Sequence, residues 1–127
     1  MAIPKLPDAE LEIMKIIWRC GGETTSAHIY RELEGKKEWA VTTVLNFLAR
    51  LVERGFLNVR RIGKANIYAP IICEDEYLES ASRSFLERLH GNSLKSLVAS
   101  LYDGEAISRG DLEELRRYIE EKAGETL

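Results

Sequence analysis

The stretch TTVLNFLARLVERG, residues 42–55, decides the fold because its polar and apolar side chains separate when it is drawn as a helix. At roughly 100° per residue, the polar side chains share an arc of about 120°. That arc holds Thr42, Thr43, Asn46, Arg50, Glu53 and Arg54. The opposite arc holds Val44, Phe47, Leu48, Leu51 and Val52. One face of this helix is therefore predicted to pack against the protein, and the other to meet a polar partner.

Two shorter amphipathic segments precede this helix. Residues 8–20 carry an apolar stripe, with Asp8 as the expected N-cap, and Gly21–Gly22 is expected to end the helix. Residues 24–34 are expected to form a second short helix with a threonine cap, and Gly35 is expected to end it. Its inward-facing residues are expected to be Ile29, Tyr30 and Leu33. Three helices with tight connections predict a helix-turn-helix core.

A change to period two follows the third helix. Leu57 and Val59 alternate with polar residues, and a second run rich in strand formers covers residues 65–71 after the pair Gly63–Lys64. This pattern predicts a two-stranded hairpin with a basic tip, and Pro70 marks the exit of its second strand. Three helices followed by a hairpin are the order of a winged helix, so we expect a winged-helix DNA-binding domain over residues 1–72.

Residues 73–127 predict three further amphipathic helices, the last opened by Ser108 with Asp111 as an acidic capping box. Their apolar stripes are too narrow to bury one another, so a second copy of the chain is expected to cover them as a dimerisation domain. The residues expected at this interface are Leu78, Phe85, Leu89, Leu94, Leu97, Val98, Leu101, Leu112, Leu115 and Ile119. The predicted fold is therefore mostly α with a small β-hairpin wing.

The charge is unevenly divided along the chain. Residues 1–72 hold 11 Lys and Arg against 8 Asp and Glu, a net +3, whereas residues 73–127 hold 7 against 13, a net −6. A local basic excess within an acidic protein indicates a surface that meets a polyanion.

Double-stranded DNA fits this pattern. Thr42 and Thr43 at the helix start are placed to hold a phosphate or reach a base edge, because free N–H groups and the positive dipole end lie there. Asn46 can pair with adenine, and Arg50 can reach guanine or a phosphate. Backbone contacts are expected from Arg54 and from the wing residues Arg60, Arg61 and Lys64.

Catalytic and metal chemistry is not predicted. The two histidines and the acidic pairs fit exposed helix faces, and we find no nucleophile triad, phosphate loop or zinc motif, and no sign of a cofactor. Cys20 and Cys73 are expected to be small buried residues.

A secretory signal and a membrane span are not recognisable, so a cytoplasmic protein without membrane insertion is expected.

Two alternatives stay open at this point. A winged helix can serve as a protein-interaction module, which would favour apolar or acidic residues on the open face of the third helix. A thiol- or metal-switched regulator of the same fold would require Cys20 and Cys73 to approach each other.

Four segments resemble the family of penicillinase and methicillin-resistance repressors, with which a copper-responsive relative is grouped. They are LPDAELEIMKIIW (6–18), WAVTTVLNFLARLVERGFL (39–57), IYAP (67–70) and SLKSLVASLYDGEAISRGDLEELRRYIEE (93–121). The resemblance implies a homodimeric repressor that binds an operator of inverted half-sites in front of antibiotic-resistance genes. It also implies groove-facing roles for Thr42, Thr43, Asn46 and Arg50, the residues that the helical arc selects.

The resemblance further implies relief of repression by a membrane sensor and protease that respond to a β-lactam and lead to cleavage in the dimerisation domain. The family's cleaved asparagine–phenylalanine pair corresponds to Ser100–Leu101 here. A second departure is Leu45, where the family sometimes has a basic or amide side chain; a leucine can touch a thymine methyl. The cysteine motif of the copper-responsive relatives is absent after Arg117.

Overall fold

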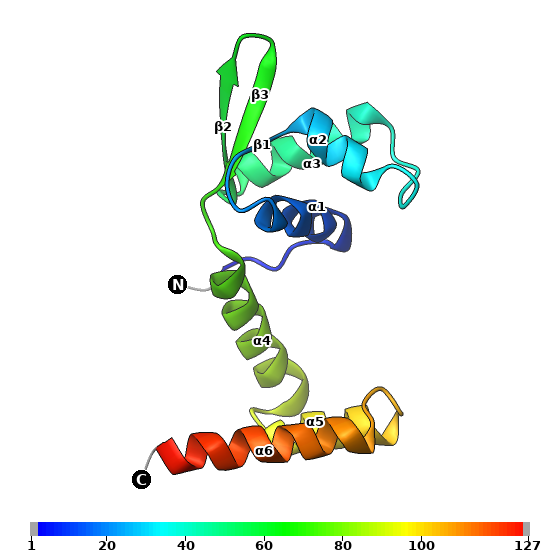
Figure 1. Ribbon diagram of the computed structural model, residues 1–127, viewed down its shortest axis with the longest axis vertical. Helices are drawn as coiled ribbons and strands as arrows, with labels where there is room; N and C mark the ends of the chain where they lie inside the picture. The colour runs from blue at the N-terminus through cyan, green and yellow to red at the C-terminus, as the bar shows by residue number, and fades with distance from the viewer. Residues whose placement is uncertain (1–2, 126–127) are drawn as a thin grey trace. The chain divides into compact units, whose positions relative to one another are not determined.

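The computed structural model describes residues 3–125 and shows a helical chain with one small sheet (Figure 1). Its elements are α1 (Asp8–Arg19), β1 (Thr24–Thr25), α2 (Ser26–Leu33), α3 (Val41–Glu53), β2 (Leu57–Ile62), β3 (Ala65–Pro70), α4 (Glu74–His90), α5 (Leu94–Asp103) and α6 (Arg109–Glu125). The chain forms two compact units that meet within α4, the first ending at Ala81 and the second starting at Ser82. The predicted helical chain with a hairpin wing is confirmed.

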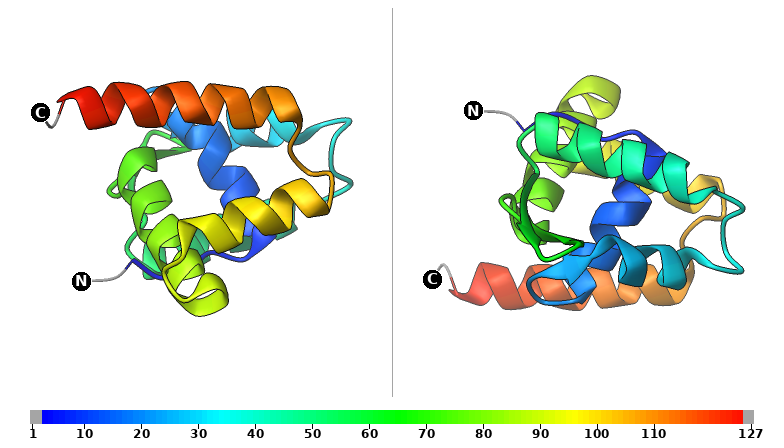
Figure 2. Two further views of the ribbon diagram at one scale, coloured as in Figure 1. Left: turned by 90° about the horizontal axis from the view of Figure 1, so that it is seen from below. Right: turned by 90° about the horizontal axis from the view of Figure 1, so that it is seen from above.

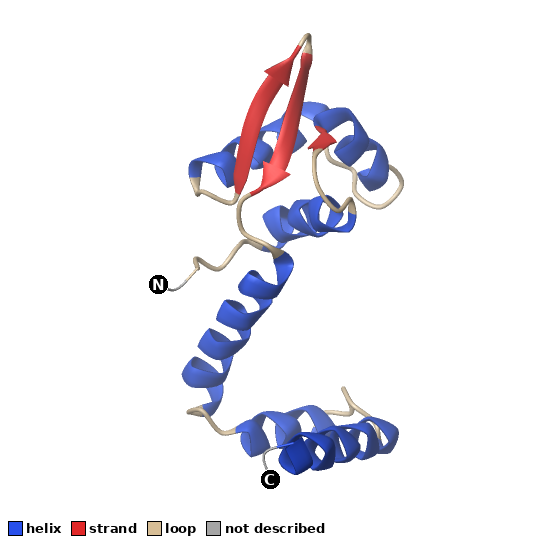
Figure 3. Ribbon diagram, turned by 60° about the vertical axis from the view of Figure 1, so that its left-hand side comes forward, coloured by secondary structure: helices blue, strands red, loops and turns tan. Residues whose placement is uncertain are grey.

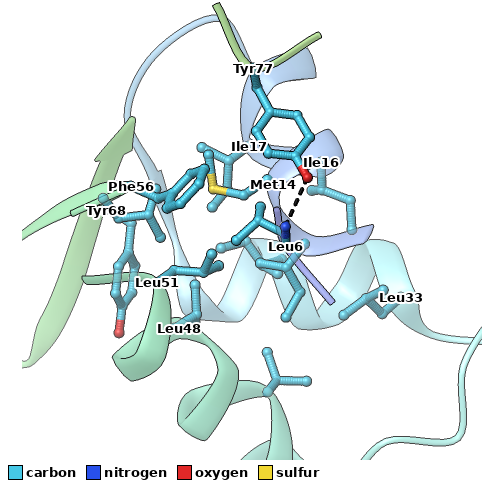
Figure 4. Packing of buried hydrophobic residues seen from close by; sticks show 14 residues of the cluster. Leu6, Met14, Ile16, Ile17, Leu33, Leu48, Leu51, Phe56, Tyr68 and Tyr77 are labelled. Atoms are coloured by element: carbon cyan, nitrogen blue, oxygen red, sulfur yellow. Dashed lines mark hydrogen bonds between the residues drawn. The ribbon is translucent and has the colours of Figure 1, made fainter. Parts of the chain in front are cut away.

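The first unit is built around one apolar core at the meeting point of α1, α2, α3 and the sheet (Figure 4). Its largest fully buried side chains include Phe56, Ile13, Met14 and Leu48. They come from segments far apart in the sequence, and their burial removes from water the apolar stripes that the sequence predicts. The core fixes which face of α3 points inward.

Helix ends follow local chemistry, with two differences from the prediction. The side-chain Oγ1 of Thr25 caps α2 by accepting from the His28 N–H at 3.1 Å, as expected of a threonine cap. The N-cap of α1 is Pro7, so Asp8 is the first helical residue and the predicted Asp8 cap was wrong. Proline is tolerated there because it has no N–H to leave unpaired, and Asp8 instead meets the positive end of the dipole.

The sheet has three antiparallel strands in the order β1–β3–β2 (Figure 3). In the hairpin, Leu57 pairs with Pro70 and Ile62 with Ala65, which leaves Gly63 and Lys64 as a two-residue turn. Gly63 has φ +60°, the left-handed conformation that such a turn requires. The two-residue strand β1, which pairs with β3 through Thr24 and Thr25, was not predicted.

The start of α4 belongs to the first unit. Tyr77 is buried, its ring lying 5.8 Å from that of Trp18 and 5.9 Å from that of Phe56. Its hydroxyl accepts from the Leu6 N–H at 2.9 Å. Trp18 adds a second tie by donating its indole N–H to the Ile72 carbonyl at 2.9 Å. These contacts fix the first turns of α4 on the core, a feature that was not predicted from the sequence.

The second unit contains α5 and α6, which run in opposite directions (Figure 2). Ser93 caps α5 through the Ser96 N–H, and the predicted capping box at Ser108 and Asp111 is confirmed by reciprocal bonds of 2.7 and 3.1 Å. From Ser82 to Gly124, none of the described side chains is buried. This unit therefore has amphipathic helices without a closed core of its own.

Candidate nucleic-acid interface

The third helix presents the surface predicted for it. Val44, Leu48 and Leu51 are almost fully buried and hold one face of α3 on the core. On the other side, Asn46 and Arg50 are exposed. They form a ridge with Thr42, which is also exposed and lies one turn before Asn46. The structure therefore brings these three side chains together on one open face.

The start of α3 is open as well. Its N-cap is Ala40, which has no side-chain acceptor, and no side chain caps the first turn. Thr42 is exposed and Thr43 half-buried beside these N–H groups. Uncapped N–H groups at the positive end of a helix favour an anion such as a phosphate.

An aromatic stack supports one edge of the open face. The ring of Trp39 meets that of Phe47 edge-on at 5.3 Å, and Lys37 lies 5.6 Å over the Trp39 ring. The guanidinium of Arg50 lies 5.9 Å from the centre of the Phe47 ring. This contact limits the side-chain freedom of Arg50.

Arg54 has a partner inside the protein. Its Nη1 lies 2.5 Å from Oε1 of Glu10, whose side chain is only 1% exposed, while the Arg54 side chain is 40% exposed. A buried carboxylate needs such a cation, so the guanidinium is tied to the start of α1. Glu10 was not among the residues predicted from the sequence, although its spacing of four and seven residues from Met14 and Ile17 places it on the buried stripe.

The wing residues are exposed but differ in their partners. Arg60 forms an ion pair with Glu23, its Nε lying 3.0 Å from Oε2 of that residue. Arg61 donates from Nε to the Gly63 carbonyl at 3.1 Å, which bends its side chain over the turn. Lys64 is exposed at the turn itself. The structure thus places all three basic side chains on the hairpin, with Arg61 and Lys64 next to its tip.

The predicted interface residues of the tail lie on open apolar surfaces. Leu97, Val98, Leu112 and Leu115 are half-buried. The others are exposed: Leu78, Phe85, Leu89, Leu94, Leu101 and Ile119. A groove of about 490 Å³ lies between α5 and α6. Its lining includes the half-buried Val98 and Leu115 and the exposed Leu94 and Ile119. Ser100 and Leu101 lie within helix α5, with Ser100 exposed.

The cysteines and histidines do not form a reactive site. Cys20 and Cys73 are both exposed, so their predicted burial was wrong. Cys20 directly follows α1 and Cys73 directly precedes α4, so both lie at helix ends outside the buried core cluster. His28 pairs with Glu32 at 3.7 Å, and His90 bonds to Ser96 at 2.9 Å. Among residues 3–125, no three His, Cys, Asp or Glu side chains gather as metal ligands would.

A known family matches this arrangement over nearly the whole chain. The family model described as penicillinase repressor matches residues 6–121. The chain belongs to the penicillinase repressor family. A curated member, the penicillinase repressor of Bacillus licheniformis, is 35% identical over 119 residues, covering 94% of this chain and 92% of that protein. The methicillin resistance regulatory protein MecI of Staphylococcus aureus is 26% identical over 118 residues, covering 93% and 95%.

Solved structures of the family match more than half of the chain. The DNA-binding domain of the repressor BlaI has 36% sequence identity and a TM-score of 0.53, covering 59% of this chain and 90% of that one. The monomeric form of Bacillus licheniformis BlaI in complex with the blaP half-operator gives 36% identity and a TM-score of 0.51, again over 59% and 90%. These likenesses confirm the winged-helix fold. In the described part of this family member, residues 3–125, no helix is both long enough and apolar enough to cross a bilayer.

Proposed function

We propose that this chain is a sequence-specific repressor of transcription that binds operator DNA with α3 in the major groove. The observation that carries the proposal is the open ridge of Thr42, Asn46 and Arg50 on a helix whose other face is fixed by a buried core. Asn46 is suited to adenine and Arg50 to guanine or a phosphate, and the uncapped helix start suits a phosphate beside Thr42 and Thr43. Family membership and the BlaI half-operator complex support the same function.

The wing supplies sequence-independent affinity in this proposal. Arg61 and Lys64 stand at the hairpin tip, where they would reach the phosphate backbone beside the groove. Arg60 would do the same from within the strand, in competition with Glu23. Arg54 would keep its ion pair with Glu10, and the exposed part of its side chain would face the phosphate backbone of the DNA. Binding should weaken steeply as salt increases, because phosphate contacts release counterions.

We further propose that two copies assemble through residues 73–127, so that residues 1–72 of each copy meet one half of a palindromic operator. The support is the second unit itself, whose apolar side chains remain open in the single chain. A two-fold dimer reads two inverted half-sites whose centres lie one duplex turn, or a multiple, apart.

The base-reading role is tested with Asn46→Ala and Arg50→Ala. Each should weaken binding to a duplex selected by the protein by roughly 1–3 kcal/mol and weaken binding to a scrambled duplex much less. Gel shifts with both duplexes at one salt concentration measure the difference. Lys15→Ala, an exposed cation on α1, is the matched control. Equal losses on the two duplexes would refute base reading by α3.

Relief of repression by cleavage between Ser100 and Leu101 is proposed from the family resemblance. Both residues are helical, so a protease would have to unwind this part of α5 before cutting it. N-terminal sequencing of fragments from producing cells treated with a β-lactam would locate the cut. An intact chain in induced cells would exclude this mode of relief.

A further inference from the structure

An apolar edge runs along the recognition helix beside its polar ridge. Val41 is 50% exposed and Leu45 is 37% exposed, large values for apolar side chains on a helix that also packs on the core. They are one turn apart, and each precedes a member of the polar ridge, Thr42 or Asn46. On a helix they therefore form a second ridge, displaced by roughly 100° from the first.

This edge borders a cavity between α2 and α3 of about 430 Å³. The lining residues are Ser26, Ala27, Tyr30, Arg31, Glu34, Val41, Val44 and Leu45. Arg31 and Glu34 bring one charge of each sign, and the α3 side of the lining is entirely apolar. The cavity is an open recess whose α3 side is apolar and whose α2 side carries hydrogen-bonding and charged groups.

The polar side chains beside the recess limit the kind of group that can fill it. A dry protein surface laid over Val41 and Leu45 would also cover Asn46 and would leave its amide without partners, which is unfavourable. The major groove of DNA offers an apolar group surrounded by acceptors and phosphates, the C5-methyl of thymine. A thymine beside α3 would therefore satisfy the apolar edge while adjacent bases and phosphates satisfy Asn46 and Arg50.

We propose that Val41 and Leu45 are specificity-determining residues that read thymine methyl groups on the α2 side of the recognition helix. The inference rests on the proposed function and deepens it, because it states part of the operator chemistry. Each half-site should hold thymine where Leu45 enters the groove, and a further thymine beside Val41 toward the start of α3. Burial of one methyl should change affinity roughly fourfold.

The test uses the full chain and a duplex that it selects from a randomised pool. Each thymine of the selected half-site is replaced in turn by deoxyuridine, which keeps base pairing and removes only the methyl group. Fluorescence anisotropy at fixed salt then gives the dissociation constant for the wild type, Val41→Ala, Leu45→Ala and the control Lys15→Ala. We expect one deoxyuridine position to cost the wild type and Lys15→Ala about fourfold, and to cost Leu45→Ala nothing. A second position should behave in the same way toward Val41→Ala.

The outcomes separate this inference from the proposed function. A selected duplex in which no deoxyuridine lowers affinity, or in which the losses are the same for all four proteins, overturns methyl reading while sequence-specific binding stands. A pool from which no sequence is enriched overturns both proposals. Circular dichroism melting checks that the alanine variants remain folded, as expected for substitutions at exposed positions.

Discussion

The carboxylate of Glu10 joins two elements that are distant in the sequence. It lies in the first turn of α1, is almost fully buried, and meets the guanidinium of Arg54 at the end of α3. A buried charge without its partner is strongly unfavourable, whereas a pair of apolar side chains in the same place can be tolerated. Arg54 therefore acts first as a structural cation that ties the end of α3 to the start of α1.

The pair gives a prediction about stability. Arg54→Ala should lower the free energy of unfolding by about 3 kcal/mol, because it leaves Glu10 buried and unpaired. The double variant Glu10→Met with Arg54→Met should recover most of this loss. Urea unfolding followed by circular dichroism measures both, with Arg19→Ala, an exposed arginine on α1, as the control. A midpoint for Arg54→Ala equal to that of the control would show that the pair does not stabilise the fold.

At the scale of an element, the capping box of α6 is sensitive to pH. The Ser108 N–H donates a hydrogen bond to the Asp111 carboxylate, and this bond is the main cause that lowers the pKa of the carboxyl below its ordinary value. The Ser108 hydroxyl lowers this pKa further. A lowered pKa in the folded state means that the ionised carboxylate stabilises the helix start above the pKa of the unfolded chain. This contribution is lost as the pH falls through the folded pKa.

We therefore expect the first turn of α6 to loosen in acid. As the pH falls below the ordinary pKa of an aspartate and Asp111 takes up its proton, the Ser108 amide should lose protection from hydrogen exchange. The variant Asp111→Asn, which keeps the shape of the side chain but cannot titrate, should show little change over the same range. NMR hydrogen exchange measures both proteins. A wild-type profile as flat as that of Asp111→Asn would contradict the assignment.

Some elements could be predicted from the sequence alone, and others could not. The faces of α3, the threonine cap and the hairpin turn follow from local period and turn chemistry, and the structure has them as predicted. The strand β1 has two residues, too few to display a period, and exists only because β3 lies beside it. The partners of Arg54 and Arg60 lie 44 and 37 positions earlier in the chain, so no local pattern could reveal them.

At the scale of the whole molecule, the open apolar groove between α5 and α6 predicts dependence on a second copy. Val98→Asp places a charge in this groove, where association would have to bury it, so the variant should sediment as a monomer. It should retain weak binding to a single half-site, because the first unit has its own core. Ser100→Asp, exposed on the same helix, should leave the sedimentation of the wild type unchanged. A dimeric Val98→Asp protein would remove the groove from the interface.

The buried Tyr77 sets a practical limit on how a DNA-reading fragment can be excised from this protein. Truncation after residue 72 would delete the ring that fills the space beside Trp18 and Phe56 and would strip the Leu6 N–H of its acceptor. A piece extended through Ala81 keeps both. The minimal unit for work in isolation is thus longer than the helices and strands that would touch the duplex.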